Sequence, residues 1–128
     1  KRIIDLDLKK NDKVPYQGVL HLDCTFNPIG KDKCIIYKDG FVDESDYQLI
    51  IDIFGEENCF HITPEEMFEM YPNIFSISPE VVVSDETFTR MNDFLRNEWG
   101  FTVEEIPYRE ISKMGGLLRC STMPLVRE

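Results

Sequence analysis

Short apolar runs of β type alternate with amphipathic helical runs along the chain. Runs rich in Val, Ile and Phe predict strands over residues 2–8, 19–26, 34–37, 59–62, 73–77, 80–84 and 101–108, with a last extended segment over 117–126. Helical spacing predicts helices over residues 43–55, 63–70 and 84–100, and a short helix or loop over 109–116. This alternation of strands and helices is typical of the α/β class.

Local signals mark the helix boundaries. The first helix is predicted to end at Gly55 and the third at Gly100, because glycine readily takes the conformation that terminates a helix. The second helix has Thr63 as its N-cap candidate, Pro64 in the first turn and Glu66 three residues after the cap. This is a capping-box pattern, which predicts a helix start.

The order of elements recurs. A strand–strand–helix–strand pattern covers residues 19–62 and is repeated over residues 74–106. The two copies share little sequence, so the recurrence predicts two similar structural units rather than a sequence repeat.

Composition limits the classes of partner. The chain has 128 residues, 42% of them apolar, which is enough to bury one core. Its 24 acidic and 14 basic residues give a net charge of −10. This charge argues against nucleic acid or an anionic membrane as partner, because both favour clustered Lys and Arg. A cationic substrate fits better, although such charge more often only keeps a surface soluble.

The cysteines indicate free thiols. Cys24, Cys34, Cys59 and Cys120 lie far apart, without the spacing of a zinc site or of a dense disulfide framework. We therefore expect no metal and no cofactor, and a reducing, cytoplasmic location. No apolar run approaches 18 residues, so no membrane span is expected.

Three residues are candidates for chemistry. His21 and Asp23 are two positions apart on a predicted strand and would face the same side, although such a pair is more often structural. Cys120 follows the pair Gly115 and Gly116, which would let the backbone approach another group closely. A lone cysteine is usually a small core residue. A cysteine with a distant histidine and carboxylate is also the general pattern of a thiol nucleophile with its base.

Two stretches carry a resemblance to a known group of enzymes. "HLDCTFNPIG" and the stretch from "NIFSIS" to "LRCSTMPLVRE" resemble the second half of the guanidine-modifying enzymes. These are the arginine deiminases, glycine amidinotransferases and dimethylarginine dimethylaminohydrolases. The specific motifs are His-x-Asp before an apolar-aromatic stretch, and Gly-Gly followed by Cys-x-x-x-Pro. The resemblance implies part of a pentein-type α/β propeller, with about two to three of its five ββαβ modules present. Residues 1–128 would be the C-terminal portion of a single such domain, without its N-terminal portion.

The resemblance implies a role for each candidate residue. Cys120 would be the nucleophile, His21 the general acid and base, and Asp23 a carboxylate that binds the guanidinium. The implied partner is a small guanidino substrate, which forms a covalent amidino adduct on Cys120 that water or an amine then resolves. A homodimer is compatible with this reading. Hydrolase and amidinotransferase both remain open.

The sequence departs from the family pattern in ways that affect substrate and activity. Deiminases of this kind carry a carboxylate-binding arginine where this chain has Met114, Gly115 and Gly116, and many relatives have Tyr-x-Arg-Asn where it has "SDETF". These departures argue against free arginine as the substrate and leave open an agmatine-like or modified guanidine, or a ureido compound such as citrulline. The acid that orients the histidine lies upstream in the family, so the 128 residues alone are expected to be inactive. The alternative is a non-catalytic pentein-like binding protein, in which the three residues would only fill the core.

Overall fold

The computed structural model describes residues 3–14, 18–123 and 125. Its strands are β1 (Phe26–Ile29), β2 (Lys33–Ile36), β3 (Cys59–His61), β4 (Phe75–Ser76), β5 (Val81–Asp85) and β6 (Thr102–Ile106). Its α-helices are α1 (Glu44–Phe54), α2 (Pro64–Phe68), α3 (Thr89–Asn97) and α4 (Arg109–Ser112), and its 3₁₀ helices are η2 (Leu22–Cys24), η3 (Lys38–Gly40) and η4 (Glu56–Asn58). The protein is therefore mixed α/β, as the sequence predicts.

Two three-stranded sheets are built in the same way. In one sheet β1 pairs antiparallel with β2, and β2 pairs parallel with β3 after the crossover through α1. In the other, β4 pairs antiparallel with β5, and β5 pairs parallel with β6 after α3. A parallel pair needs such a crossover, because a tight turn can join only antiparallel strands. The β–β–α–β order thus occurs twice, as the recurrence in the sequence predicts, although the first strand is Phe26–Ile29 rather than residues 19–26.

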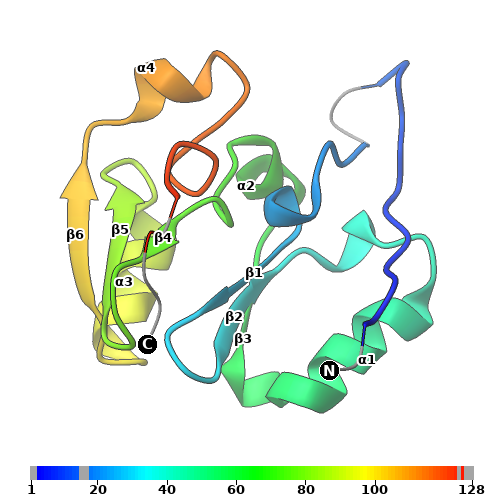
Figure 1. The fold of residues 1–128 in the computed structure, drawn as a ribbon, viewed down its shortest axis with the longest axis horizontal. Coiled ribbons are helices and arrows are strands. Elements are labelled where there is room, and N and C mark those ends of the chain that lie inside the picture. The colour runs from blue at the N-terminus through cyan, green and yellow to red at the C-terminus, as the bar shows by residue number, and fades with distance from the viewer. Residues whose placement is uncertain (1–2, 15–17, 124, 126–128) are drawn as a thin grey trace.

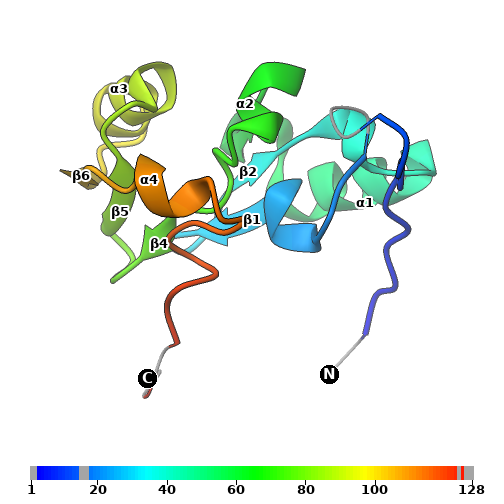
Figure 2. The ribbon, with the colours of Figure 1, turned by 90° about the horizontal axis from the view of Figure 1, so that it is seen from above.

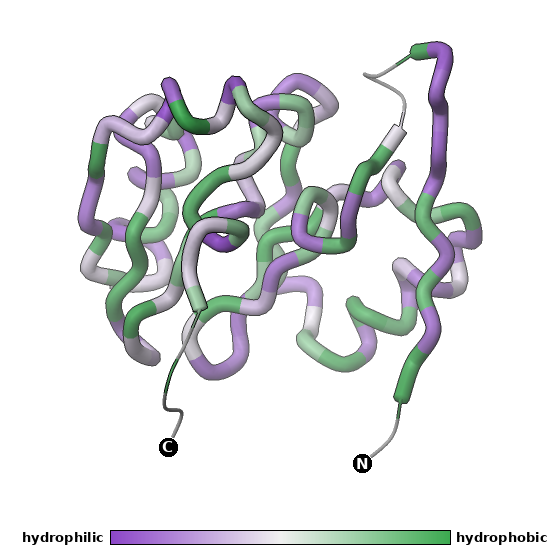
Figure 3. Tube along the Cα trace, turned by 45° about the horizontal axis from the view of Figure 1, so that its top comes forward, coloured by the Kyte–Doolittle hydropathy of each residue, from purple (hydrophilic) through white to green (hydrophobic). Residues whose placement is uncertain are grey.

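The two sheets lie side by side in both views (Figures 1 and 2). The larger core contains residues of both sheets, including Ile35 and Phe60 from the first and Val82 from the second, together with Leu95 of α3. A smaller core packs α1 against the outer side of β2 and β3. Hydrophilic residues are spread along the trace between short hydrophobic stretches, as expected for so acidic a chain (Figure 3).

The helix boundaries follow the predicted signals in part. Gly55, with a φ of 84°, directly follows α1 as predicted, whereas α3 ends at Asn97, three residues before Gly100, whose φ is 70°. Thr63 and Glu66 form the capping box that opens α2. Helix α3 begins at Thr89, five residues later than predicted, because Ser84 and Asp85 belong to β5.

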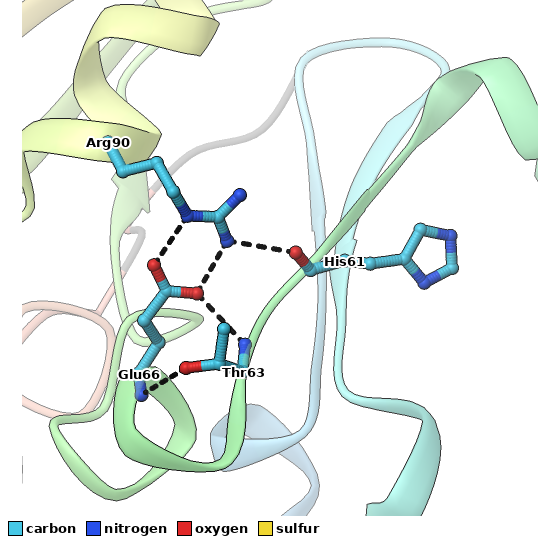
Figure 4. Close-up of polar contacts among 4 residues, drawn as sticks. All are labelled: His61, Thr63, Glu66 and Arg90. Atoms are coloured by element: carbon cyan, nitrogen blue, oxygen red, sulfur yellow. Dashed lines mark hydrogen bonds and ion pairs between the residues drawn. The ribbon is translucent and has the colours of Figure 1, made fainter.

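A polar cluster connects α2 and β3 to α3 (Figure 4). The Glu66 carboxylate accepts hydrogen bonds from Arg90 Nε at 2.6 Å and from the Thr63 backbone N–H at 2.9 Å. Arg90 also donates to the His61 backbone carbonyl at 3.0 Å, and its guanidinium lies 4.4 Å from the centroid of the Phe60 ring. This cluster therefore joins the two β–β–α–β units near the start of α2.

Three predicted extended segments are wrong. Of residues 2–8, the described part forms only an isolated bridge from Leu8 to Phe41. Residues 19–25 form a bend and η2, because β2 ends at Ile36 and the chain then turns through η3, leaving residues 19–25 no strand to pair with. Within the described part of 117–126, residues 117–121 form a helical turn, since the Ser121 N–H donates to the Leu117 carbonyl at 3.0 Å.

Candidate active site

Cys120 lies in the turn that follows α4. The turn is anchored by the buried side chains of Leu117 and Leu118, while Cys120 itself is exposed. Of the preceding glycines, Gly115 needs its conformational freedom, because its φ is 87°. A Cβ on Gly116 would meet Cys120 Cβ at 3.4 Å, which is an ordinary contact. The turn therefore holds the backbone of Cys120 in place while its thiol stays accessible.

Asp23 reaches Cys120 across 97 positions of sequence. The Cys120 thiol donates a hydrogen bond to Asp23 Oδ2, with a distance of 3.2 Å between Sγ and Oδ2. Asp23 is half-buried and lies in the first turn of η2. The 3₁₀ helix, rather than a strand, directs the carboxylate to the thiol.

Asn73 also contacts Cys120, and the sequence did not reveal it. Its side-chain Nδ2 donates to Cys120 Sγ at 3.1 Å, and its Oδ1 accepts from the Cys120 backbone N–H at 3.2 Å. The Asn73 carbonyl accepts from the Arg119 N–H at 3.1 Å. Asn73 is fully buried. It is the first residue of the strand predicted over 73–77, where nothing in a single sequence distinguishes it from an ordinary asparagine at the end of a strand.

A second buried asparagine supports this segment. Asn27 of β1 donates through Nδ2 to the carbonyls of Pro72 at 2.6 Å and Ile74 at 2.9 Å, on either side of Asn73. The backbone around Asn73 is therefore tied to the first sheet.

His21 lies at the N-terminal end of η2 and is exposed. Its backbone carbonyl accepts from the Cys24 N–H at 3.1 Å. The strand geometry from which His21 and Asp23 were expected to share a face is absent. Within the part of the chain that the structure describes, no hydrogen bond joins the His21 imidazole to Asp23 or Cys120. The role of His21 stays a prediction.

The other three thiols are buried, as predicted. Burial raises the pKa of Cys24, Cys34 and Cys59 above the ordinary value of 9.0. Cys34 and Cys59 are paired neighbours on β2 and β3, with their sulfur atoms 3.4 Å apart. Cys24 lies beside the site, with its sulfur 3.9 Å from Asp23 Oδ1, but in a 3₁₀ helix rather than the expected strand. Of the four cysteines, only Cys120 is thus open to a substrate.

The described residues contain no group of three His, Cys, Asp or Glu side chains placed to hold a metal ion. None of the helices in the described ranges is both long and apolar enough to cross a membrane.

Comparison with known proteins defines the family. Residues 39–127 match the arginine deiminase family, a range that includes Cys120 but not His21 or Asp23. The chain is 30% identical over 113 residues to the uncharacterized protein YkgA of Bacillus subtilis, covering 88% of this chain and 37% of that protein. It is 39% identical over 67 residues to an arginine deiminase of Latilactobacillus sakei subsp. sakei, covering 52% of this chain and 16% of the deiminase.

Solved structures have the same fold. The N-terminal domain of ArgZ, an arginine dihydrolase from the ornithine–ammonia cycle in cyanobacteria, superposes with a TM-score of 0.73 at 22% identity, over 84% of this chain and 38% of that one. SxtG, an amidinotransferase from Microseira wollei, superposes with a TM-score of 0.67 at 18% identity, over 86% of this chain and 32% of that one. The chain belongs to the arginine deiminase family, within the pentein superfamily. It spans 37% of YkgA and 16% of the deiminase, well under two thirds of either relative.

Proposed function

We propose that this chain carries the nucleophile and a substrate-binding carboxylate of an enzyme that acts on a guanidino or ureido compound. The observation that carries the proposal is the contact between the exposed Cys120 thiol and Asp23, at 3.2 Å. The contact brings together two of the three residues that the family resemblance assigns to the reaction. The two β–β–α–β units would be two modules of a pentein propeller in the whole protein.

The pairing of a thiol with a carboxylate suits a planar cation. A guanidinium presents two parallel N–H groups, which a carboxylate binds through paired, charge-assisted hydrogen bonds. Because Asp23 Oδ2 lies 3.2 Å from Cys120 Sγ, a guanidinium held by Asp23 would bring its carbon close to the sulfur. Holding the reacting atoms in this way lowers the entropic part of the barrier.

The proposed reaction has two steps, the formation of an adduct on Cys120 and its resolution. The Cys120 thiolate attacks the central carbon, a C–S bond forms, and one C–N bond breaks as the departing amine takes a proton from the His21 imidazolium. A water molecule, or the amine of an acceptor in a transferase, then attacks the same carbon. His21 accepts the proton of the attacking group, and the C–S bond breaks to restore the thiolate.

The test uses the full-length protein and a panel of arginine, agmatine, methylated guanidines and citrulline. Cys120→Ser should lower turnover by about 10³-fold or more, because a hydroxyl is a far weaker nucleophile near neutral pH. Asp23→Asn should mainly raise KM for cationic guanidines, since the amide supplies no negative charge. Cys59→Ala, which removes a thiol buried away from the site, should retain activity.

The outcomes separate the proposal from its rival. Near-normal turnover in Cys120→Ser would refute the proposed nucleophile. No turnover of any guanidino or ureido compound by the full-length protein, with binding retained, would instead favour a non-catalytic pentein-like binding protein.

A further inference from the structure

We propose that Asn73 is a positioning residue that holds Cys120 and stabilises its thiolate form. This inference rests on the proposed function and assigns a new participant to the same site. Asn73 lies 47 positions before Cys120 and bonds both to its sulfur and to its backbone.

The orientation of the Asn73 amide is fixed by its partners. The Cys120 backbone N–H can only donate, so the atom of Asn73 that faces it must be the carbonyl oxygen Oδ1, at 3.2 Å. The amide nitrogen Nδ2 must then face Cys120 Sγ, at 3.1 Å. A flipped amide would set a donor against the backbone donor. Asn73 therefore presents a hydrogen-bond donor to the sulfur.

The position of Asn73 is as constrained as its orientation. The residue is fully buried, and its own backbone carbonyl accepts from Arg119. Asn27 binds the carbonyls of the residues on both sides of it. The donor thus needs no rearrangement when the charge on the sulfur changes.

The sulfur lies between this donor and a carboxylate. In the neutral thiol, S–H donates to Asp23 while Asn73 donates to the sulfur. When the thiol ionises, its hydrogen bond to Asp23 is lost, and the negative charge of the Asp23 carboxylate repels the negative charge on the sulfur. The bond from Asn73 remains and becomes stronger, because its acceptor is now charged. Among the described residues, Asn73 is the side chain that donates to this sulfur, so its hydrogen bond offsets the repulsion between Asp23 and the thiolate.

The two functions of Asn73 can be separated by substitution. Asn73→Asp keeps an oxygen that accepts from the Cys120 N–H but removes the donor to the sulfur. Asn73→Ala removes both and introduces no buried charge, so it repeats the test if the aspartate variant does not fold. Asn92→Ala is the matched control, because Asn92 is also fully buried but bonds to Asp85 and Glu105 instead.

The assay is alkylation of the full-length protein by iodoacetamide, with labelling of each cysteine quantified by peptide mass spectrometry from roughly pH 6 to pH 9. This measurement does not require turnover. Cys34 is completely buried, so its resistance to labelling reports that each variant is folded. We expect folded Asn73→Asp and Asn73→Ala to label Cys120 about tenfold more slowly at neutral pH, with a rate profile displaced to higher pH. Asn92→Ala should label Cys120 at the wild-type rate.

Turnover gives a second readout. The same Asn73 variants should lower kcat and leave KM nearly unchanged, because Asn73 acts on the nucleophile. Wild-type alkylation of Cys120 in a folded Asn73 variant would overturn this inference. The proposed function would still stand if Cys120→Ser abolished turnover, so the two failures are distinguishable.

Discussion

Replacing Glu66 by Gln should weaken the junction between the two units in a pH-dependent way. The Glu66 carboxylate accepts from Arg90 Nε at 2.6 Å, from Arg90 Nη2 at 2.5 Å and from the Thr63 N–H at 2.9 Å. A glutamine of the same shape has one acceptor oxygen and one donor nitrogen, so at least one of these bonds is lost and the charge of the pair is removed. The side chain of Glu66 is only 12% exposed, but that of Arg90 is 51% exposed, which screens the pair. The expected loss is therefore about 1–2 kcal/mol, below the value for a fully buried charged hydrogen bond.

The pH dependence follows from the pKa of Glu66. Burial raises the pKa of this carboxyl, but the hydrogen bonds from Arg90 and Thr63 outweigh it and hold the pKa below its ordinary value of 4.5. A lowered pKa stabilises the folded state above the unfolded value, and this contribution disappears as the pH falls through the folded value. Wild type and Glu66→Gln should therefore differ at neutral pH and converge in acid.

Urea unfolding followed by the fluorescence of Trp99 provides the assay. Trp99 is the single tryptophan of the 128 residues, and its ring packs edge-on against Phe60, the ring over which Arg90 lies. Glu110→Gln is the matched control, because Glu110 pairs with Lys113 on an exposed surface and should cost less than about 0.5 kcal/mol. A Glu66→Gln variant as stable as wild type at neutral pH, or equally destabilised in acid, would refute the reasoning.

Three further predictions concern the cysteines and the turn before Cys120. Alkylation of the folded protein should label Cys120 first, with the three buried thiols labelled only on unfolding; faster labelling of Cys34 or Cys59, quantified by peptide mass spectrometry, would contradict this. Burial raises the pKa of Cys34 and Cys59, so their contribution to stability is present below the ordinary thiol pKa of 9.0 and is lost as the pH rises through the folded-state pKa. The free energy of unfolding should therefore fall in alkali, and it should fall less steeply in Cys34→Ala. Gly115→Ala should cost about 1 kcal/mol in urea unfolding because its φ is 87°, whereas Gly116→Ala should cost little.

Local signals were sufficient to predict most of the helices. Gly55 and the Thr63–Glu66 capping box act within one turn of the chain, so the sequence alone defines them. The strand predicted over residues 19–26 was wrong because strand formation depends on a distant partner. Its apolar residues match the strand pattern, but β2 ends at Ile36 and pairs only as far as Phe26.

The candidate site was predictable only in part, for the same reason. Asp23 and Cys120 were proposed from motifs, and the structure brings them together, although through a 3₁₀ helix rather than a strand. Asn73 could not be found, because its importance lies in contacts to a residue 47 positions away. Leu117 and Leu118 suggested an extended segment, yet their side chains anchor the helical turn that exposes Cys120.

The most direct test of the central claim is the mass of Cys120 during turnover. Full-length protein is mixed with a substrate from the panel and quenched in acid within one turnover. The protein is then digested, and the mass of the peptide containing Cys120 is measured by mass spectrometry. The account predicts a covalent adduct on this peptide that is absent in Cys120→Ser. A gain equal to the substrate minus ammonia, or minus the methylamine of a methylated guanidine, would show that the terminal nitrogen leaves, as in a deiminase. A gain of the amidino group alone would show that the alkylamine leaves, as in an amidinotransferase or an amidinohydrolase. Turnover with an adduct on another residue, or undiminished turnover in Cys120→Ser, would contradict the assignment of Cys120 as the nucleophile.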